Sequence, residues 1–493
     1  MSDELYERLG VRPFINCCGT RTVHGGSLML PAVRKAMVDA AGRFVNLNEL
    51  ILASGRRIAA LTGAEAALIT SGGAASLVAA TAAAMTKGDP ERMLRLPNSD
   101  GMPAQVVMPK GARFTYDHAI RTAGARVVEV ADRKAMAEAL RSGTAMVATI
   151  GTKDADLPIR LDECVALAEP LGIPVLIDAA SEHLERPNPY LSRGASFVAY
   201  SGGKYLKGPQ STGLLLGKRQ WIEAARLNAS PHHAIGRPMK ISKEEVAGLL
   251  AAVEFWAEGR DHEAEKARWT GDLETIARLT REVGSVTAEI EVPAKSHEQV
   301  PRLRIAWDRG RVGVGGLDLR ELMLAHEPKI MLDDRGATDR SIFILPFNLE
   351  PGEAEIVGRA IARALATATP SPRPVVDEPP AADLTGLWAV EIAFAAERTP
   401  HRVRLRQSGT RLEGTHTTLD LVAPASGTIT GSRVAFSSLH PYEGSNLSYA
   451  FTGAVANGAM SGTVLLGTSG DSAPGPLKMR EFGSATWDAR RLG

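Results

Sequence analysis

The sequence predicts an α/β domain built on a mostly parallel sheet, a smaller α+β domain and a C-terminal antiparallel β-barrel. Three observations support this prediction. Short apolar runs alternate with helical stretches between residues 65 and 217, which is typical of a parallel sheet covered by helices. A proline-rich segment follows at residues 369–382, and strand-length runs separated by turn pairs come after it. A chain of 493 residues is also long enough for two or three domains.

The first domain is expected over residues 1–240, as an N-terminal segment followed by a three-layer αβα arrangement. The predicted strands are Ala66–Ile69, Val106–Met108, Val127–Val130, Ala145–Ile150, Val175–Ile177 and Phe197–Tyr200. The predicted helices are Ala74–Met85, Asp117–Ala123, Ala135–Arg141 and Asp162–Leu171. Helical crossovers cover both faces of such a sheet. Ligands then bind outside the carboxyl ends of its strands.

The second domain is expected over residues 241–368. Its first helix, Lys243–Trp256, is amphipathic, because apolar residues recur at helical spacing. The predicted strands are Val286–Val292, Leu303–Trp307 and Ile342–Pro346, and a last helix spans Gly352–Leu365. These elements predict a small α+β domain with a few antiparallel strands.

Residues 369–382 contain five prolines, which predicts an extended linker. Residues 383–493 then form the barrel domain. Its predicted strands are Leu387–Phe394, Val403–Gln407, Leu412–Thr417, Gly427–Thr430, Val434–Ser438, Leu447–Thr452, Met460–Leu466 and Ala485–Ala489, with turns at Ser408-Gly409, Asn457-Gly458 and Ser469-Gly470. This pattern fits a small, lipocalin-like barrel. Such a barrel can be filled by side chains or can hold one small ligand, and the sequence leaves both possibilities open.

Composition limits the function classes. Hydrophobic residues make up 44%, charged residues 23%, and the formal net charge is +1, so the chain lacks the basic excess of a nucleic-acid binder. No apolar run approaches the ~20 residues of a membrane span, and the N-terminus lacks a signal or transit pattern. Cys17, Cys18 and Cys164 predict no disulfide framework. Neither they nor His232-His233 have metal-ligand spacing. We therefore expect a cytoplasmic protein without metal, nucleic acid or membrane partners.

Lys204 lies in a glycine-rich segment, Ser201 to Gln210, directly after a predicted strand. A lysine at the carboxyl end of a buried strand can be desolvated, which lowers the pKa of its amine and makes it a better Schiff-base nucleophile. The alternative is a lysine on a surface turn. A phosphate-binding nucleotide loop is excluded, because it needs a glycine where Val198 stands and a serine or threonine where Tyr205 stands.

Asp178 closes the apolar run Ile173–Ile177, so its carboxylate is expected at the same edge of the sheet as Lys204. The two residues are 26 positions apart, which fits one strand–connection–strand step. A carboxylate at this edge can keep the ring nitrogen of a bound cofactor protonated. The alternative is an aspartate that caps the following helix.

The segment from Thr70 to Ser76 is the third element. A predicted strand runs into Ser71, Gly72, Gly73 and Ala74 and then into an alanine-rich helix. Free backbone N–H groups and the positive end of the helix dipole meet at such a point, which makes it a phosphate site. The alternative is that the small residues mark close packing of the helix on the sheet. Phosphate cradle, carboxylate and lysine together are the set that pyridoxal 5′-phosphate (PLP) requires.

At these residues the sequence resembles the fold-type-I PLP-dependent enzymes. It is more closely similar to the seryl-tRNA selenium transferase-like family, which includes D-glucosaminate-6-phosphate ammonia-lyase. The resemblance covers roughly residues 5–365, and the lysine segment is its most specific part. The other segments that carry it are Arg12–Asn16 with Gly19-Thr20, Leu61–Ala67 running into Ser71–Ala75, Tyr116–Arg121, Asp178–Ala180 and Gly236–Lys240.

The resemblance implies that Lys204 forms the Schiff base with PLP and that Asp178 pairs with the pyridine nitrogen. It implies that Ser71, Gly72, Gly73 and Ala74 bind the phosphate, with a hydroxyl added by Ser201. It also implies that a residue between 110 and 118 covers the ring. Arg113 is the preferred candidate, since a planar guanidinium can stack, and Tyr116 and His118 compete with it. Relatives often carry a histidine–arginine–asparagine run here, where this sequence has Ala112-Arg113-Phe114.

The substrate contacts are less well defined. Arg237 is a candidate for holding a carboxylate or phosphate, since arginine can bind such groups through two hydrogen bonds. Weaker candidates are Thr20 with Arg21, and Arg304. Each of the three arginines could instead form an ordinary ion pair within the protein. Relatives follow the aspartate with small residues, glutamine, leucine and prolines, where this sequence has Ser181–Glu185. His183 and Glu182 could therefore affect substrate choice or proton transfer, or could be local polar residues.

The reaction expected from the resemblance is abstraction of the Cα proton followed by β-elimination. A hydroxy or otherwise β-substituted amino acid would give ammonia and a 2-oxo acid. The alternative activity is that of a racemase or epimerase, or of an aldolase. A further alternative is a protein that binds PLP or another ligand without turnover. Selenium transfer is disfavoured because no basic RNA-binding region is present. Enzymes of this fold are commonly completed by a second subunit, so we expect a homodimer or larger homo-oligomer.

Overall fold

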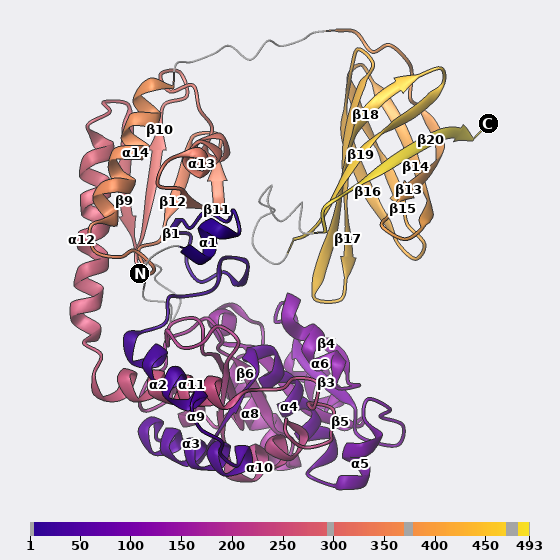
Figure 1. The fold of residues 1–493 in the computed structure, drawn as a ribbon. Coiled ribbons are helices and arrows are strands. Elements are labelled where there is room, and N and C mark those ends of the chain that lie inside the picture. Colours follow the sequence, from indigo (N-terminus) through magenta and orange to yellow (C-terminus); the bar gives the residue numbers. More distant parts are fainter. Residues whose placement is uncertain (1–3, 293–299, 369–377, 470–481, 493) are drawn as a thin grey trace. The chain divides into compact units, whose positions relative to one another are not determined.

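The computed structural model describes residues 4–292, 300–368, 378–469 and 482–492 (Figure 1). The chain divides into two compact units. The first comprises Met1–Asp308, Leu317–Asp333 and Arg340–Thr367, and the second comprises Arg309–Gly316, Asp334–Asp339 and Ala368–Gly493. Among the described residues, no helix combines the length and the apolar composition needed to cross a membrane.

The first unit is built on a seven-stranded sheet with the order β2-β8-β7-β6-β5-β3-β4. The strands are β2 (Ala66–Thr70), β3 (Gln105–Pro109), β4 (Arg126–Val130), β5 (Thr144–Ile150), β6 (Val175–Asp178), β7 (Phe197–Ser201) and β8 (Gly213–Gly217). Strands β3 to β7 are parallel to one another, whereas β8 runs antiparallel between β2 and β7. The six strands and the mostly parallel sheet predicted from the sequence are confirmed. Strand β8 was not predicted.

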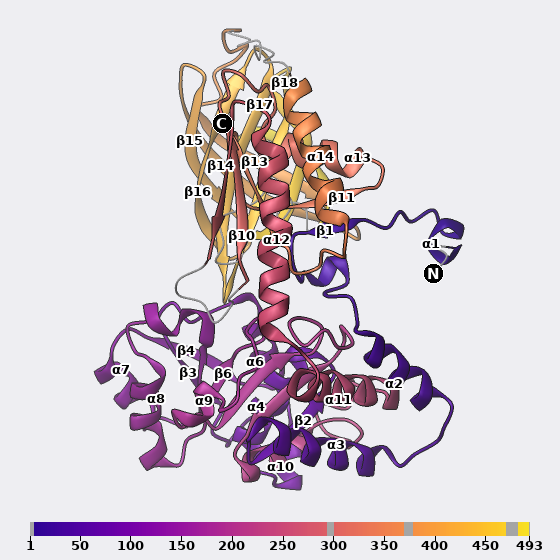
Figure 2. The same ribbon diagram turned by 90° about the vertical axis from the view of Figure 1, so that its left-hand side faces the viewer.

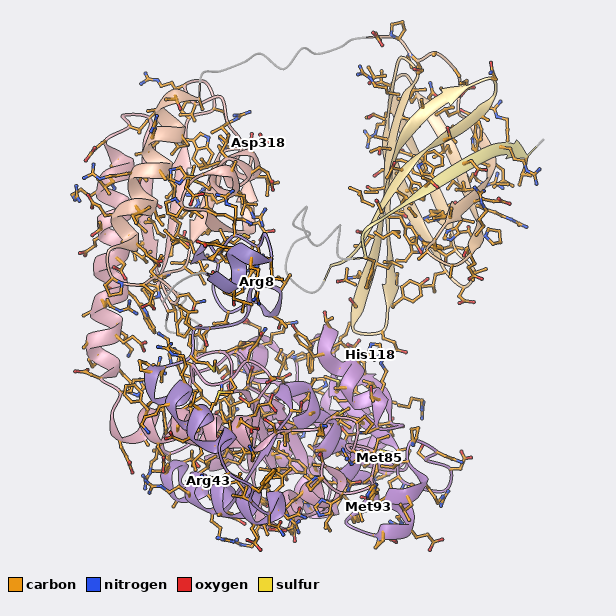
Figure 3. All side chains as sticks on the ribbon, in the orientation of Figure 1. Arg8, Arg43, Met85, Met93, His118 and Asp318 are labelled. Atoms are coloured by element: carbon orange, nitrogen blue, oxygen red, sulfur yellow. The ribbon has the colours of Figure 1, made fainter. Side chains whose placement is uncertain are left out.

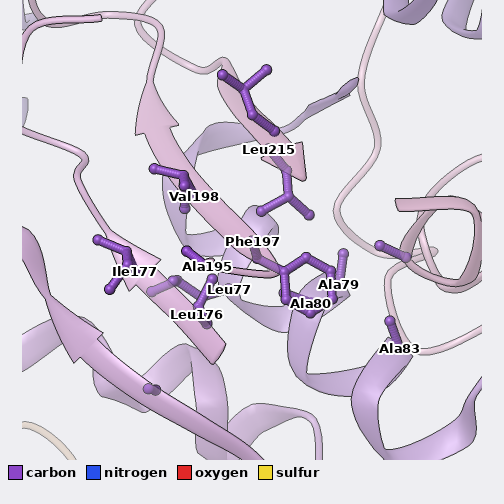
Figure 4. Close-up of a cluster of buried hydrophobic side chains, with 14 of the residues drawn as sticks. Leu77, Ala79, Ala80, Ala83, Leu176, Ile177, Ala195, Phe197, Val198 and Leu215 are labelled. Atoms are coloured by element: carbon purple, nitrogen blue, oxygen red, sulfur yellow. The ribbon is translucent and has the colours of Figure 1, made fainter. Parts of the chain in front are cut away.

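Helix α4 (Gly72–Thr86) forms the centre of this core. Its residues from Ala75 to Thr86 are all buried, and short alanine side chains allow the helix to lie close to the sheet. Figure 4 shows Leu77, Ala79 and Ala80 of α4 beside Phe197 and other apolar residues of the strands. The predicted helix Ala74–Met85 is confirmed.

The other helices of the large domain cover the sheet or connect its strands. They are α2 (Pro31–Ala41), α3 (Leu47–Thr62), α5 (Pro90–Arg95), α6 (His118–Thr122), α7 (Arg133–Ala139), α8 (Leu161–Ala168), α9 (Pro189–Ser192), α10 (Arg219–Asn228) and α11 (Lys243–Glu258). The short helix α1 (Glu4–Arg8) lies away from this sheet (Figure 1). Short 3-10 turns lie at Thr22–His24, Thr115–Asp117, Gly151–Asp156 and Glu169–Leu171. Cys17, Cys18 and Cys164 are buried and free.

Helix α11 begins with a capping box between Ser242 and Glu245, and it lies beside α2 and α3 (Figure 2). Its buried residues Val246, Leu249 and Val253 belong to the same apolar core as the seven-stranded sheet. The sequence analysis assigned this helix to the domain that starts at residue 241. We propose instead that the boundary between the large and small domains lies after α11.

The small domain contains a five-stranded sheet with the order β1-β11-β12-β10-β9. Its strands are β1 (Ile15–Cys17), β9 (Val286–Glu291), β10 (Arg302–Trp307), β11 (Ile330–Thr338) and β12 (Ser341–Ile344), and its helices are α12 (His262–Arg281), α13 (Gly316–Ala325) and α14 (Glu353–Thr367). Helices α12 and α14 lie side by side (Figure 1). The strands expected at β9, β10 and β12 and the helix expected at α14 are confirmed, whereas β1, β11, α12 and α13 were not predicted.

The second unit contains a closed barrel in which each strand pairs with the next and β13 pairs with β20. The strands are β13 (Gly386–Ala393), β14 (Arg398–Ser408), β15 (Arg411–Thr417), β16 (Val422–Thr430), β17 (Arg433–Tyr442), β18 (Ser445–Ala456), β19 (Ala459–Ser469) and β20 (Ser484–Leu492). The eight-stranded antiparallel barrel is confirmed. Asn457 and Gly458 have φ angles of 51° and 78°, as required in a two-residue hairpin turn.

Two expectations fall partly on residues that the structure does not describe. Residues 369–377 of the proposed linker and Gly470 of the turn pair Ser469-Gly470 lie outside the described residues. The boundaries of the linker and of the barrel domain at residues 369–382 and 383–493 therefore stay proposals.

Candidate active site

The phosphate cradle forms where β2 turns into α4. Ser71 occupies the N-cap position, but its side chain does not cap the helix. Gly72 has a φ of +84°, a left-handed conformation that glycine adopts without strain. A Cβ atom on Gly73 would lie 3.7 Å from Ala180 Cβ and 3.8 Å from the Tyr200 carbonyl oxygen. The first turn of α4 therefore lies against the ends of β6 and β7.

Asp178 is the last residue of β6, and the parallel pairing places it opposite Ala199 of β7. Its side chain is only 8% exposed, and Oδ1 accepts a hydrogen bond of 2.8 Å from the backbone N–H of Ala180. Burial raises the pKa of this carboxyl group, while the Ala180 N–H and the positive charge of Lys204 act in the opposite direction. A further cation beside Asp178 would stabilise the carboxylate.

The segment around Lys204 folds back on itself after β7. The Gly202 N–H donates to the Thr212 carbonyl and the Gly208 N–H donates to the Gly202 carbonyl, both at 2.8 Å. A Cβ atom on Gly202 would lie 2.0 Å from Thr212 Oγ1. The close approach of residues 202 and 212 therefore requires glycine at position 202. The structure therefore gives a physical reason for the glycines that precede the lysine.

Ser27 fixes this segment from the N-terminal part of the chain. Its hydroxyl group lies 3.0 Å from the carbonyl oxygens of both Gly203 and Lys204, and its backbone N–H donates to the Gly203 carbonyl. A Cβ atom on Gly26 would meet the same Gly203 oxygen at 2.6 Å. The sequence analysis missed Ser27, because no local pattern connects residues that are 176 positions apart.

Arg113 follows β3 at the carboxyl edge of the sheet. Its guanidinium forms an ion pair with Asp117, which is fully buried. This pair fixes the orientation of the guanidinium plane. The competing candidates are more exposed: Tyr116 is 59% exposed, and His118 lies exposed at the start of α6 on the surface of the large domain (Figure 3).

His183 makes its contacts with aromatic residues. Its ring stacks on Tyr205 at 4.2 Å and lies 6.5 Å from the Trp269 ring. Burial, assisted by the nearby Arg260, lowers the pKa of His183 to about 4, so the imidazole is neutral at pH 7. His183 lines a cavity of about 470 Å³ together with residues of α11 and α12. Lys204, Asp178 and Ser71 do not line this cavity.

Of the remaining substrate candidates, Arg237 belongs to a segment that adjoins the cradle. Its neighbour Gly236 lines a small pocket that also contains Thr70 and Ser71. Thr20 precedes Arg21, which forms an ion pair with Asp333. Arg304 lies on β10 of the small domain. The structure thus brings the Arg237 segment to the phosphate cradle and leaves Arg304 within an antiparallel sheet.

Glu182 and Lys207 have partners that the sequence analysis did not identify. The buried Glu182 accepts a hydrogen bond from the Tyr190 hydroxyl, and both side chains fill the space where a Cβ atom on Gly151 would lie. Lys207 forms an ion pair of 3.2 Å with Glu265. Partners this distant in sequence carry no spacing signal, so only the structure reveals them.

These residues fit PLP. The uncapped first turn of α4 suits a phosphate group. The buried Asp178 suits a protonated ring nitrogen, and the Lys204 segment follows the neighbouring strand. Among the described residues, no group of three histidine, cysteine or acidic side chains could hold a metal ion.

Comparison with known proteins identifies the class. A solved structure of D-glucosaminate-6-phosphate ammonia-lyase aligns with a TM-score of 0.66 and 28% identity, over 75% of this chain and all of that one. The chain is a fold-type-I PLP-dependent enzyme.

The family follows from sequence comparison. The model described as L-seryl-tRNA selenium transferase (SelA) matches residues 15–359, and the chain belongs to this family. The D-glucosaminate-6-phosphate ammonia lyase of Salmonella typhimurium is 31% identical over 65% of this chain and 86% of its own. The 5′-C-glycyluridine monooxygenase-decarboxylase of a Streptomyces species is 31% identical over 72% and 88%. The L-seryl-tRNA(Sec) selenium transferase of Solidesulfovibrio magneticus is 27% identical over 72% and 82%.

Proposed function

We propose that this enzyme is a lyase that eliminates a β-substituent from a small amino acid and releases ammonia and a 2-oxo acid. The observation that carries the proposal is that α4, Asp178 and the Lys204 segment meet at one edge of the sheet. The 31% identity to an ammonia lyase supports elimination as the reaction.

Each residue has a defined task in this proposal. The cofactor, when bound, supplies a ring that accepts the electron pair left at the substrate Cα. Lys204 would hold the cofactor through its side-chain amine and would move the proton at the substrate Cα. Asp178 would hold a proton on the ring nitrogen. The N–H groups of Gly72, Gly73 and Ala74, with the hydroxyls of Ser71 and Ser201, bind the phosphate group.

Ring and substrate contacts complete the proposed site. Arg113 covers the ring with its guanidinium plane, which Asp117 orients. Arg237 holds an acidic group of the substrate through two hydrogen bonds, and its segment adjoins the cradle at Ser71. Thr20 and His183 are secondary substrate candidates. His183 would contact substrate through a neutral imidazole, because burial lowers its pKa.

A second copy of the chain is proposed to complete the site. Five large apolar side chains between residues 23 and 45 are exposed in the single chain: Val23 (83%), Leu28 (62%), Val38 (73%), Phe44 (103%) and Val45 (52%). This stretch includes Ser27, which touches the Lys204 segment, so a subunit that covers it lies next to the site. Sedimentation velocity should show a dimer or larger assembly, and a fully active monomer would refute this part.

The reaction is tested by screening β-hydroxy, D- and phosphorylated amino acids in deuterated water. Release of ammonia together with a 2-oxo acid supports elimination. Exchange of the Cα hydrogen without ammonia indicates a racemase or epimerase, release of an aldehyde indicates an aldolase, and release of carbon dioxide indicates decarboxylation. Each of these three outcomes overturns the proposal of β-elimination. Lys204→Ala should lose the activity, whereas Lys87→Ala, a change of a lysine remote from the Lys204 segment, should keep it.

A further inference from the structure

The two ends of the barrel differ in construction. At one end the strands are joined by two-residue connections at residues 409–410, 431–432 and 457–458. Trp388 and the buried Leu384 fill this end, and the Trp388 indole N–H donates to the Leu384 carbonyl at 2.9 Å. The opposite end carries the connections at 394–397, 418–421 and 443–444. We call it the histidine end, because three buried histidines lie there on strands β14, β15 and β17.

These histidines form a hydrogen-bonded chain. His401 Nδ1 lies 2.8 Å from His416 Nε2, and His416 Nδ1 lies 3.1 Å from His440 Nε2 and 2.7 Å from the Ser438 hydroxyl. The Tyr449 ring lies 4.9 to 5.6 Å from all three imidazoles. The side chains are 0% to 5% exposed. Three polar rings are therefore buried at one end of an otherwise apolar interior.

Each N···N contact contains one hydrogen, and His416 takes part in both contacts. The tautomer of His416 therefore sets the direction in which the hydrogen bonds run from one histidine to the next. If His416 donates through Nε2 it accepts through Nδ1, and the reverse arrangement exchanges these roles. In both arrangements one terminal nitrogen, His401 Nε2 or His440 Nδ1, is a donor and the other is an acceptor. His440 Nδ1 is buried and has no hydrogen-bond partner in the described part of the chain. A buried polar atom without a hydrogen-bond partner costs free energy. A ligand that forms a hydrogen bond with His440 Nδ1 would remove this cost.

The rim of the histidine end is apolar. The exposed large apolar residues of the described barrel are Leu419 (71%), Val422 (64%), Leu439 (42%), Tyr442 (39%) and Phe482 (60%). Leu419 and Phe482 lie on connections at this end of the barrel, and Tyr442 is the last residue of β17. Val422 and Leu439 alternate with buried residues of their strands and face outward. An apolar rim above buried polar groups matches a ligand that has an apolar body and a polar head. The deeper interior is filled, because Phe436 and Phe451 stack at 4.6 Å.

The charges favour an uncharged head group. Burial lowers the pKa of His401 to about 4 and that of His416 to about 3, and also lowers the pKa of His440. The imidazoles are therefore neutral at pH 7. The acidic residues of these three connections, Glu397, Asp420 and Glu443, are exposed at the same end and repel an anion. A metal ion does not fit this arrangement, because His416 presents a different nitrogen to each neighbour.

We propose that the histidine end of the barrel binds a small amphipathic molecule with a hydroxyl head group, as in an alcohol or a phenol. A hydroxyl both donates and accepts a hydrogen bond, so it suits either direction of the histidine chain. The apolar body lies against the rim of Leu419, Tyr442 and Phe482. This site is independent of Lys204 and of the reaction proposed above.

The test compares octanol, octanoate and octylamine, which share an eight-carbon skeleton and differ in their polar head group. Isothermal titration of the full-length holoenzyme should show octanol binding about tenfold or more tighter than either charged probe, the equivalent of about 1.4 kcal/mol. Tighter binding of octanoate or octylamine overturns the head-group assignment, and no binding of any probe overturns the site. Octanol should also shift the ring-nitrogen resonances of His401 and His440 in the histidine-labelled wild type. Binding without such shifts places the ligand elsewhere and refutes the proposal.

Variants separate the histidines from the rim. His401→Phe should weaken octanol binding about tenfold, because it removes a polar partner of the head group. Phe482→Ser should weaken binding of all three probes, since it shortens the apolar rim. Thr415→Val, an exposed change on the same strand as His416, serves as the matched control and should bind as wild type does. Equal octanol affinity in His401→Phe and wild type, with the barrel intact by circular dichroism, contradicts the proposal.

Discussion

The buried histidines of the barrel predict a loss of stability in acid. His416 is fully buried, and its pKa falls from 6.5 in the unfolded chain to about 3 in the folded barrel. Below pH 6.5 the unfolded state therefore binds a proton that the folded state does not, so stability is complete above pH 6.5 and falls as the pH drops toward 3. At pH 4.5, two units below the unfolded value, the loss is about 2.7 kcal/mol. His401 contributes a further loss of the same sign, since its pKa is lowered to about 4.

Other groups at the histidine end do not offset this loss. Among the described residues, the titratable side chains that face His416 are His401, His440 and Tyr449. The acidic residues of the adjacent strands, Glu391, Glu413 and Asp488, are exposed on the outside of the barrel. In the part of the barrel that the structure describes, no carboxylate is therefore placed in the interior to stabilise a protonated imidazole.

Native-state hydrogen exchange of peptides from β14 to β17 measures this effect in the full chain, after correction for the intrinsic pH dependence of exchange. His416→Phe should be less stable than wild type at pH 7, by about 1–3 kcal/mol, because partners of His416 lose a hydrogen bond. It should also lose about 2.3 kcal/mol less than wild type between pH 6.5 and pH 4.5, because the imidazole of the unfolded chain is already half protonated at pH 6.5. Thr415→Val should keep the wild-type dependence. If His416→Phe keeps it as well, the buried imidazole is not the source of the acid sensitivity.

Two further predictions concern the PLP site. Gly202→Ala should destabilise the large domain by about 1–3 kcal/mol in thermal unfolding, because its Cβ would lie 2.0 Å from Thr212 Oγ1. Gly271→Ala on α12, where a Cβ meets open space, should instead be neutral or gain about 0.5–1 kcal/mol, and equal effects of the two changes would contradict the packing argument. Asp178→Asn should leave the cofactor-free protein as stable as wild type or more stable, since burial already raises the pKa of this carboxyl group. The same change should lower turnover more than tenfold, and unchanged turnover would remove Asp178 from the proposed mechanism.

The elements that the sequence predicted well are those with a strong local signal. The barrel strands alternate buried and exposed residues, and positive-φ residues such as Asn457 and Gly458 mark their turns. Helix α12 was missed because its sequence is strongly charged, although its buried residues Trp269, Leu273, Ile276, Ala277 and Thr280 recur at helical spacing. Strand β8 was missed because its three leucines between glycines do not distinguish a strand from a buried loop.

The same holds for the site: residues with a local sequence signal were predicted, and contacts that depend on tertiary folding were not. Strand ends can be read from apolar runs, so the sequence predicted Lys204, Asp178 and the Ser71–Ala74 segment, which the structure brings to one edge. The contact of Ser27 with the Lys204 segment depends on tertiary folding and carries no local signal. The histidine chain was missed for a similar reason. His401, His416 and His440 become neighbours only through the register of strands β14 to β17.

The central claim is that Lys204 carries the cofactor. Reduction of the holoenzyme with borohydride, followed by proteolysis and mass spectrometry, fixes the cofactor covalently to the lysine that holds it. The modification is expected on Lys204 alone and should be absent in Lys204→Ala. Lys207, three residues away and paired with Glu265, is the internal control and should stay unmodified. Modification of Lys207 or of any other lysine, with Lys204 unmodified, would contradict the account.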